Sequence, residues 1–569
     1  MARRDVHFEV FLKKHKKADW ALVEAVTDRQ EALDLGHTLK KRHPKGSVRV
    51  QREEWVAEEN AFRGGVIFEA GPERYTDPKE KTGEALLPCV TPDDLAGSAA
   101  RETIRRVLEG WFVRRQVSPL ELLHRPDLIE DLDGSDSDLQ GAVQKVAVAR
   151  AQNSDASVHA YVRLINDLVE KGVSQARREA KAGRKPPKAK GFAELTEKIL
   201  SEGGPEKRLR RAIAEQIADA GDFGAKTSLL LDFHDDLPAD PEARAFAAKQ
   251  TDAFIAEMLS FEPAIRAVLG ETGDLGEEVM RLTGIYEGAP DCADLLDAPE
   301  AARRLAEKFQ RKQLPDTHIE VAKRILSALR APKRFRPESV MREIELARKL
   351  AMRLIAASGP NLHPDSLVDA FTHRSAKLLA PEAVEEALAN AQDAPEQIER
   401  LFKFEDNLVG EANKAKLAAY LRARLKTKPV ESHFVRGPGK PFERLARLAA
   451  FQTRALKGGF PAADRTELAD AFDQLGMAIL DETKILSRLA SGDQPALDRA
   501  AALLKLANQG VLPSGRCSQD AQARAMRLLA GELGRGESAD PVNTGKLKDI
   551  RALMAELRPK QAEDQAGAS

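Results

Sequence analysis

The stretch Leu468-Ala469-Asp470-Ala471-Phe472-Asp473-Gln474-Leu475-Gly476-Met477-Ala478-Ile479 carries the pattern that decides the fold. Its apolar side chains Leu468, Phe472, Leu475 and Ile479 recur at steps of four, three and four residues. This spacing puts them on one face of an α-helix, and that face must be buried against neighbouring structure. The stretch therefore predicts an amphipathic helix inside a bundle.

Similar apolar stripes recur through most of the chain. Val158, Val162, Ile165 and Val169 have the same spacing, and residues 338–357 carry a broader apolar arc that predicts several neighbours. Helix starts recur as well, each pairing a polar cap with a proline that loses no hydrogen bond in the first turn. They are Thr91-Pro92, Ser118-Pro119, Asp240-Pro241 and Asp297-Ala298-Pro299. From residue 91 onward the sequence therefore predicts helices with short connections.

The first 75 residues have a different pattern, rich in Val, Phe and Trp. Strands are predicted at 6–12, 19–26, 47–56 and 62–69, with a helix at 28–42 between the second and third. This ββαββ order places one helix on one face of a mainly antiparallel sheet, and Gly64-Gly65 predicts a bulge or bend within the last strand. The predicted fold class is thus predominantly α, as bundles or an irregular helical array, with a small N-terminal α/β domain.

A chain of 569 residues exceeds one ordinary domain. Residues 171–190 hold eight Lys or Arg against one acid, which predicts a basic linker, and the Pro and Gly residues of 427–441 predict a hinge. The resulting organisation is an α/β domain (1–75), a helical segment (91–170), the linker (171–190), a helical domain (191–426), the hinge (427–441), a C-terminal bundle (442–558) and a disordered tail (559–569).

Composition excludes several classes of function. The chain has 89 Lys and Arg against 90 Asp and Glu, so its net charge of -1 creates no global attraction to nucleic acid or to an acidic membrane. Charges interrupt the N-terminal residues, and no apolar run reaches the roughly 18 residues that span a bilayer. We therefore expect a cytoplasmic protein without membrane insertion. The three cysteines have no metal-ligand spacing, and no cofactor is expected.

Two groups of residues have the chemistry of metal ligands, because carboxylates and imidazoles bind divalent ions. The first is Asp232, His234, Asp235 and Asp236; the second is Asp365, Asp369 and His373, which a helix would place on one face. The alternative interpretations are a polar loop for the first group and a solvated helix face for the second. These residues are weak candidates, so the sequence assigns no catalytic or metal site.

The basic linker contains the weak candidates for contact with nucleic acid. They are Arg177, Arg178, Lys181, Arg184, Lys185, Lys188 and Lys190. No aromatic residue interrupts them and prolines prevent a continuous helix there, so a solvated tether is the favoured interpretation and a nucleic-acid partner is not expected. An acidic stretch at 127–138 lies just upstream, and the two segments are expected to attract each other.

These observations favour a non-enzymatic cytosolic adaptor, scaffold or regulatory protein that acts through contacts with protein partners, whose identity the sequence does not give. Self-association through residues 1–75 is a subsidiary expectation, because a short antiparallel sheet offers exposed edges. Two alternatives remain: a nucleic-acid-binding protein that uses residues 171–190, and a metal-dependent hydrolase with an Asp/His cluster.

Overall fold

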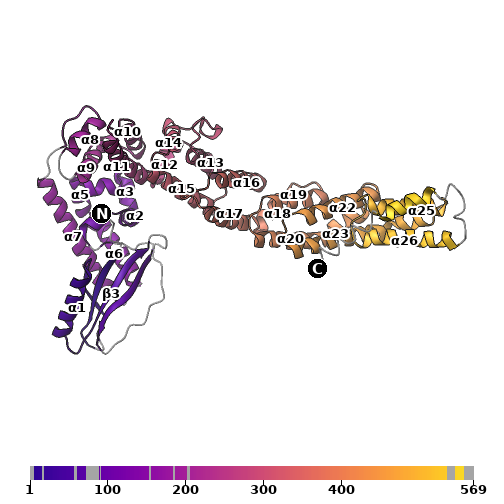
Figure 1. Ribbon diagram of the computed structural model, residues 1–569, viewed down its shortest axis with the longest axis horizontal. Coiled ribbons are helices and arrows are strands. Elements are labelled where there is room, and N and C mark those ends of the chain that lie inside the picture. Colours follow the sequence, from indigo (N-terminus) through magenta and orange to yellow (C-terminus); the bar gives the residue numbers. More distant parts are fainter. Residues whose placement is uncertain are drawn as a thin grey trace. The chain divides into compact units, whose positions relative to one another are not determined.

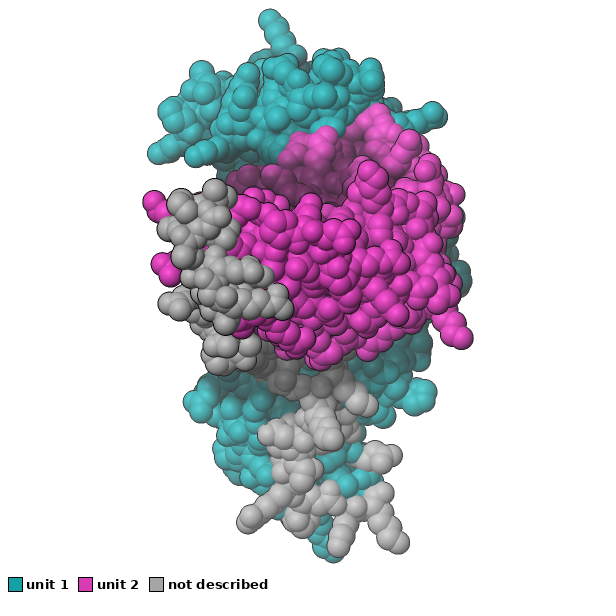
Figure 2. Space-filling model, turned by 90° about the vertical axis from the view of Figure 1, so that its right-hand side faces the viewer, with its two compact units in different colours: residues 1–272, 284–324 teal, residues 273–283, 325–569 magenta. Residues whose placement is uncertain are grey.

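The computed structural model describes residues 6–15, 18, 20–56, 61–71, 89, 91–152, 156–182, 186–201, 205–534 and 545–555. The described chain is mostly helical, with a four-stranded antiparallel sheet near the N-terminus (Figure 1), which confirms the predicted fold class. It divides into two compact units, coloured separately in Figure 2. Unit 1 comprises residues 1–272 and 284–324, and unit 2 comprises residues 273–283 and 325–569.

The sheet follows the predicted ββαββ order. Its elements are β1 (Val6–Lys13), β2 (Ala21–Val26), α1 (Arg29–Arg42), β3 (Ser47–Val56) and β4 (Ala61–Ala70), and the strands lie in the order β2-β1-β3-β4. Helix α1 begins after Asp28, whose carboxylate accepts hydrogen bonds from the backbone N–H groups of Gln30 and Glu31. Gly36 lets this helix approach the sheet closely, because a Cβ there would lie 3.0 Å from Val50 Cγ2.

Both faces of the sheet are covered. Successive side chains on a strand point to opposite faces, so Phe8, Val10 and Leu12 of β1 pack under α1 in an apolar core. Phe11, on the other face, joins a second core with residues of α6 (Asp136–Gln152) and α7 (Val158–Ala182). His7 and Glu9 alternate with Phe8 and Val10 along β1, so they lie on the same face of the sheet as Phe11.

The irregularity in the last strand lies away from the predicted position. The β3–β4 register shifts between Val50 and Gln51, whose partners are Phe68 and Val66, whereas the pairing through Gly64 and Gly65 is continuous. Gly64 has a different role. A Cβ built there would lie 2.5 Å from Glu53 Oε1, so the glycine leaves room for a carboxylate on the neighbouring strand.

The remaining elements of unit 1 are helices. Ser118 and Glu121 form the capping box that their spacing suggests. These helices are η1 (Pro92–Ala96), α2 (Ser98–Val107), α3 (Glu109–Arg115), α4 (Pro119–His124), α5 (Pro126–Asp133), α6 and α7 as above, α8 (Phe192–Leu200), α9 (Pro205–Ile217), η2 (Ala218–Ala220), α10 (Phe223–Asp235), α11 (Pro241–Leu259), α12 (Glu262–Leu269), η3 (Ala293–Leu295) and α14 (Glu300–Gln310).

The helices of unit 2 pack around one continuous apolar core. Two helices, α13 (Leu275–Tyr286) and α15 (Pro315–Arg330), contain the boundaries between the two units. Leu468, Phe472, Leu475 and Ile479 are all buried in this core, which confirms the predicted stripe. Its helices are α16 (Val340–Ala356), α17 (Pro364–Leu378), α18 (Pro381–Ala389), α19 (Ala394–Asn407), α20 (Glu411–Leu425), α21 (Lys428–Arg436), α22 (Pro441–Lys457), α23 (Ala462–Thr483), α24 (Ile485–Ala490), α25 (Ala496–Asn508), α26 (Arg516–Gly534) and a helix at 545–555. Figure 1 shows α22 beside α23 and α25 beside α26.

Two segments differ from their predicted form. Residues 171–182 continue α7, because Lys, Arg, Gln and Ala are good helix formers. Residues 428–436 of the predicted hinge form α21, with Pro429 in the first turn and with Val430 and Phe434 buried in the core. The predicted tail at 559–569 lies outside the described residues. None of the described helices combines the length and apolar composition that a bilayer crossing needs.

Candidate functional site

The first predicted ligand cluster lies at the end of α10, and its members face different partners. Arg304 Nη2 lies 2.8 Å from Asp232 Oδ1 and 2.6 Å from Asp235 Oδ2. Asp236 accepts a hydrogen bond of 2.6 Å from the backbone N–H of Phe192, at the start of α8. The imidazole of His234 points to another helix, with Nδ1 3.0 Å from Thr251 Oγ1. These groups thus connect α10 to α14, α8 and α11 rather than converge on one ion.

The second predicted cluster is an exposed stripe on α17. Asp369 Oδ2 pairs with Arg330 at 2.9 Å, and Asp365 Oδ2 lies 3.4 Å from His363 Nδ1. His373 is exposed on the same helix. Within the part of the chain that the structure describes, no group of three or more His, Cys, Asp or Glu side chains is arranged to hold a metal.

The basic residues also have local partners. Arg177 on α7 lies 3.0 Å from Asp133 Oδ2 and 3.9 Å from Glu130 Oε1, which confirms the expected attraction to the acidic stretch. Arg178 donates a hydrogen bond to the carbonyl of Ser174. Lys181, Lys188 and Lys190 are exposed, whereas Arg184 and Lys185 lie outside the described residues.

A layer of polar side chains lies between the sheet and the helices α6 and α7. His7 and Glu9 of β1 and Glu53 of β3 occupy the sheet side, and Arg150 of α6 and Tyr161 of α7 occupy the helix side. Glu9 is only 1% exposed. Because a charged group is rarely buried unless it is paired, the fold constrains the chemistry of this polar layer strongly.

Glu9 is the centre of the polar layer. Arg150 donates to Glu9 Oε1, and the hydroxyl of Tyr161 donates to Glu9 Oε2 at 3.2 Å. His7 Nε2 lies 3.2 Å from Arg150 Nη2 and 3.4 Å from Glu9 Oε1. His7 Nε2 thus lies within reach of both the guanidinium of Arg150 and the carboxylate of Glu9, and the tautomer of the imidazole decides to which of them it hydrogen-bonds. Glu53 is the cross-strand neighbour of His7.

The two carboxylates of the polar layer have opposite pKa shifts. Burial raises the pKa of Glu9, but Arg150 and His7 outweigh burial and bring that pKa down to about 2. Burial and the nearby charge of Glu9 raise the pKa of Glu53 to about 7. Burial lowers the pKa of His7. At neutral pH Glu9 is therefore ionised, whereas Glu53 titrates near pH 7.

We expect Glu53→Gln to remove part of the pH dependence of stability. A carboxyl group whose pKa is raised on folding stabilises the fold fully below its unfolded pKa of 4.5, and this stabilisation is lost as pH rises through about 7. The loss by pH 8 should be about 2–3 kcal/mol in the free energy of unfolding. His7 acts in the opposite direction below pH 6.5, because its pKa is lowered. Urea unfolding of both proteins at pH 5 and pH 8 isolates the contribution of Glu53; equal pH dependence in both would contradict it.

A cavity of about 170 Å³ adjoins the polar layer. His7, Glu9, Arg150 and Tyr161 all line it. Its walls carry both signs of charge, so it offers hydrogen-bonding groups without a strong preference for anions or cations.

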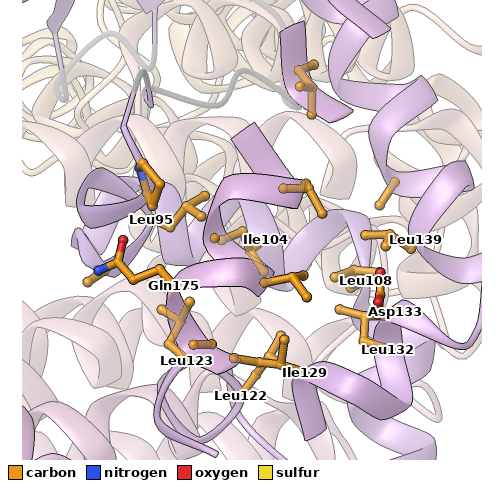
Figure 3. A pocket seen from close by; sticks show the side chains of 18 of the residues that line it. Leu95, Ile104, Leu108, Leu122, Leu123, Ile129, Leu132, Asp133, Leu139 and Gln175 are labelled. Carbon is orange, nitrogen blue, oxygen red and sulfur yellow. The ribbon is translucent and has the colours of Figure 1, made fainter. Parts of the chain in front are cut away.

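A second cavity, of about 200 Å³, lies among η1, α2 and α4 to α7. Its lining is almost entirely aliphatic and includes Leu95, Ile104, Leu108, Leu122 and Leu139, whose side chains converge in Figure 3. Polar residues are few among the lining residues, and they are Asp93, His124, Asp133, Gln175 and Lys207. Val146 and Ile165 line both cavities, so the polar and apolar cavities are neighbours.

Sequence reasoning did not find these two cavities. The only local signal was in β1, where His7 and Glu9 alternate with Phe8 and Val10 as in a strand with one solvated face. Helices α6 and α7, which bury that face, begin more than a hundred residues later.

Comparison with protein-family models, with curated proteins and with solved structures finds no match for this chain.

Proposed function

We propose that this chain is a cytoplasmic, non-enzymatic adaptor or scaffold that acts through contacts with protein partners. The ion pairs and hydrogen bonds described above support this proposal, because they pair Asp232, Asp235 and Asp369 with arginines of this chain and Asp236 with a backbone N–H group. A hydrolase would instead need such carboxylates to converge on a metal or a substrate.

The observation that carries the proposal is three exposed apolar side chains on α16 and α17, two helices that pack together. Met352 and Ile355 of α16 are 67% and 46% exposed, and Val368 of α17 is 47% exposed. Large apolar side chains left in water by neighbouring helices are characteristic of a surface that a partner covers. Residues 352–368 thus hold three of the most exposed large apolar side chains among the described residues.

The polar residues beside this surface indicate the chemistry of the partner. Glu345, Arg348 and Lys349 are also exposed on α16, and they lie seven, four and three residues before Met352, which places them on one face with it. A partner helix with an apolar stripe and an acidic flank would match this face in both hydrophobicity and charge.

We expect the double variant Met352→Lys/Ile355→Lys to lose its partner. Two charges at the centre of a contact surface should weaken binding at least about thirtyfold, as removal of a hot spot does. The measurement is quantitative affinity capture from the native cell with the tagged full chain. Leu456→Lys, at a residue of α22 that is 38% exposed, is the matched control and should recover the same partners as the unmodified chain. Equal recovery with the double variant would reject this surface.

Self-association through residues 1–75 is a second part of the proposal. Among the described strands β4, of ten residues, lies at an edge of the sheet, and a strand edge can add a strand from another copy. The test needs the full chain, because α6 and α7 cover Phe11 and Trp20, which residues 1–75 alone would expose. Light scattering over a range of concentrations reads the oligomeric state, and a strict monomer would exclude self-association.

A further inference from the structure

The apolar cavity of unit 1 is half-open, with charged residues at its mouth and an aliphatic floor. Asp93 and Lys207, which line it, are exposed to solvent. Leu108, Leu122 and Val146, which also line it, are buried. The aliphatic side chains come from η1, α2 and α4 to α7 and converge in Figure 3. A ligand that enters past the charged residues therefore meets hydrocarbon from several helices.

The volume of the cavity suits a small molecule. A dry protein cavity of roughly 150 Å³ takes up benzene. In proportion, the volume of about 200 Å³ has room for roughly eight carbon atoms. A short aliphatic chain therefore fills the cavity.

The charged groups at the mouth are engaged with groups of the protein. Asp93 Oδ1 lies 3.3 Å from Lys207 Nζ and accepts a hydrogen bond of 3.1 Å from Gln175 Nε2. Asp133 Oδ2, also at the cavity, lies 3.0 Å from Arg177 Nη2. A charged ligand of either sign would thus approach both carboxylates and cations, so the mouth favours neither an anion nor a cation.

The walls below the mouth favour hydrocarbon over polar groups. His124 lines the cavity, but its Nε2 is buried within the wall and lies out of reach of a ligand. A polar group that is buried against aliphatic side chains without a hydrogen bond is unfavourable, whereas each buried CH₂ group is favourable. The cavity is therefore suited to an uncharged chain.

We propose that this cavity binds an uncharged aliphatic molecule of roughly eight carbon atoms. The chain lies against Leu108, Leu122 and Val146, and a terminal hydroxyl group stays in water at the mouth. Burial of the chain supplies the affinity, because removal of apolar surface from water is the main favourable contribution in such cavities. This site is independent of the surface on α16 and α17, so failure of either proposal leaves the other standing.

Calorimetric titration of the full chain with three probes of equal chain length tests the proposal. One equivalent of 1-octanol should bind with a dissociation constant below about 1 mM. Octanoate and octylamine should bind at least about fivefold more weakly, because their charged groups lose hydration at the mouth without gaining a favourable partner. Absence of octanol binding up to about 1 mM, or binding of either charged probe as tightly as octanol, would overturn the proposal.

A second comparison tests the position of the ligand. Gly172 lines the cavity from α7, and a Cβ there would lie 3.5 Å from Leu95 Cδ1, an ordinary contact distance. Gly172→Phe should weaken octanol binding at least about tenfold by filling the cavity, whereas the matched control Gly172→Ala adds little volume and should bind octanol as the unmodified chain does. Ala176→Phe, one turn further along α7 and also in the lining, should weaken binding in the same way. Tryptophan fluorescence melts verify that each variant is folded, and full octanol binding by either folded phenylalanine variant would overturn the proposal.

Discussion

Replacement of Glu9 by glutamine is expected to lower the free energy of unfolding of unit 1 by about 3–5 kcal/mol, since it removes the carboxylate that pairs with the buried guanidinium of Arg150. Glu9 is 1% exposed and accepts hydrogen bonds from both Arg150 and Tyr161. The amide keeps the shape of the side chain but removes its charge. Urea unfolding followed by tryptophan fluorescence measures the effect on unit 1, because all three tryptophans of the chain lie in residues 1–272.

Two comparisons distinguish the loss of a buried ion pair from a simple loss of packing. Glu54→Gln alters a solvent-exposed ion pair with Arg52 and should change stability by less than about 1 kcal/mol. Glu9→Gln/Arg150→Met removes both charges, so it should be more stable than Glu9→Gln alone. A loss below about 1 kcal/mol in Glu9→Gln, or a further loss in the double variant, would contradict the assigned role of Glu9.

Replacement of Arg374 by methionine is expected to lower the free energy of unfolding of unit 2 by about 3–5 kcal/mol. Arg374 of α17 is buried against Glu343 of α16, with Nη2 2.8 Å from Glu343 Oε1. The same guanidinium donates to the carbonyls of Leu329 and Lys333 and lies over the ring of Phe335. Methionine fills much of the volume but leaves Glu343 charged and buried.

Arg330→Met is the matched control, because Arg330 of α15 forms an exposed ion pair with Asp369 of α17, the helix that carries Arg374. It should change stability by less than about 1 kcal/mol. Hydrogen exchange of α16 and α17 is the suitable measurement, since unit 2 contains no tryptophan. If Arg374→Met and Arg330→Met increased exchange equally, the buried pair would have no special role in holding these helices together.

Local patterns predicted the secondary structure well. The predicted strands at 6–12 and 47–56 agree closely with β1 (Val6–Lys13) and β3 (Ser47–Val56), because alternation and flanking turns are visible within a few residues. The capping box of Ser118 was equally visible. The basic segment at 171–182 was misjudged because charge composition alone does not distinguish a solvated helix from a linker.

The sites could not be predicted in the same way, because they depend on distant contacts. Glu9 and Arg150 are 141 positions apart, and nothing near either residue in the sequence indicates the other. The Asp232 to Asp236 cluster shows the converse. These neighbours in sequence point toward α14, α8 and α11, because one turn of helix directs adjacent side chains to different sides.

The interleaving of the two units along the chain constrains how the protein can be divided into fragments. Truncation after residue 272 removes residues 284–324 from unit 1. Truncation after residue 324 keeps Gly273–Thr283 but removes the rest of unit 2. The second fragment would lose, for example, the bond from the Gly276 N–H to the Phe335 carbonyl. During synthesis, unit 1 is complete only when Arg324 has left the ribosome. By then the first segment of unit 2, Gly273–Thr283, has been made, but the residues that it packs against in unit 2 have not.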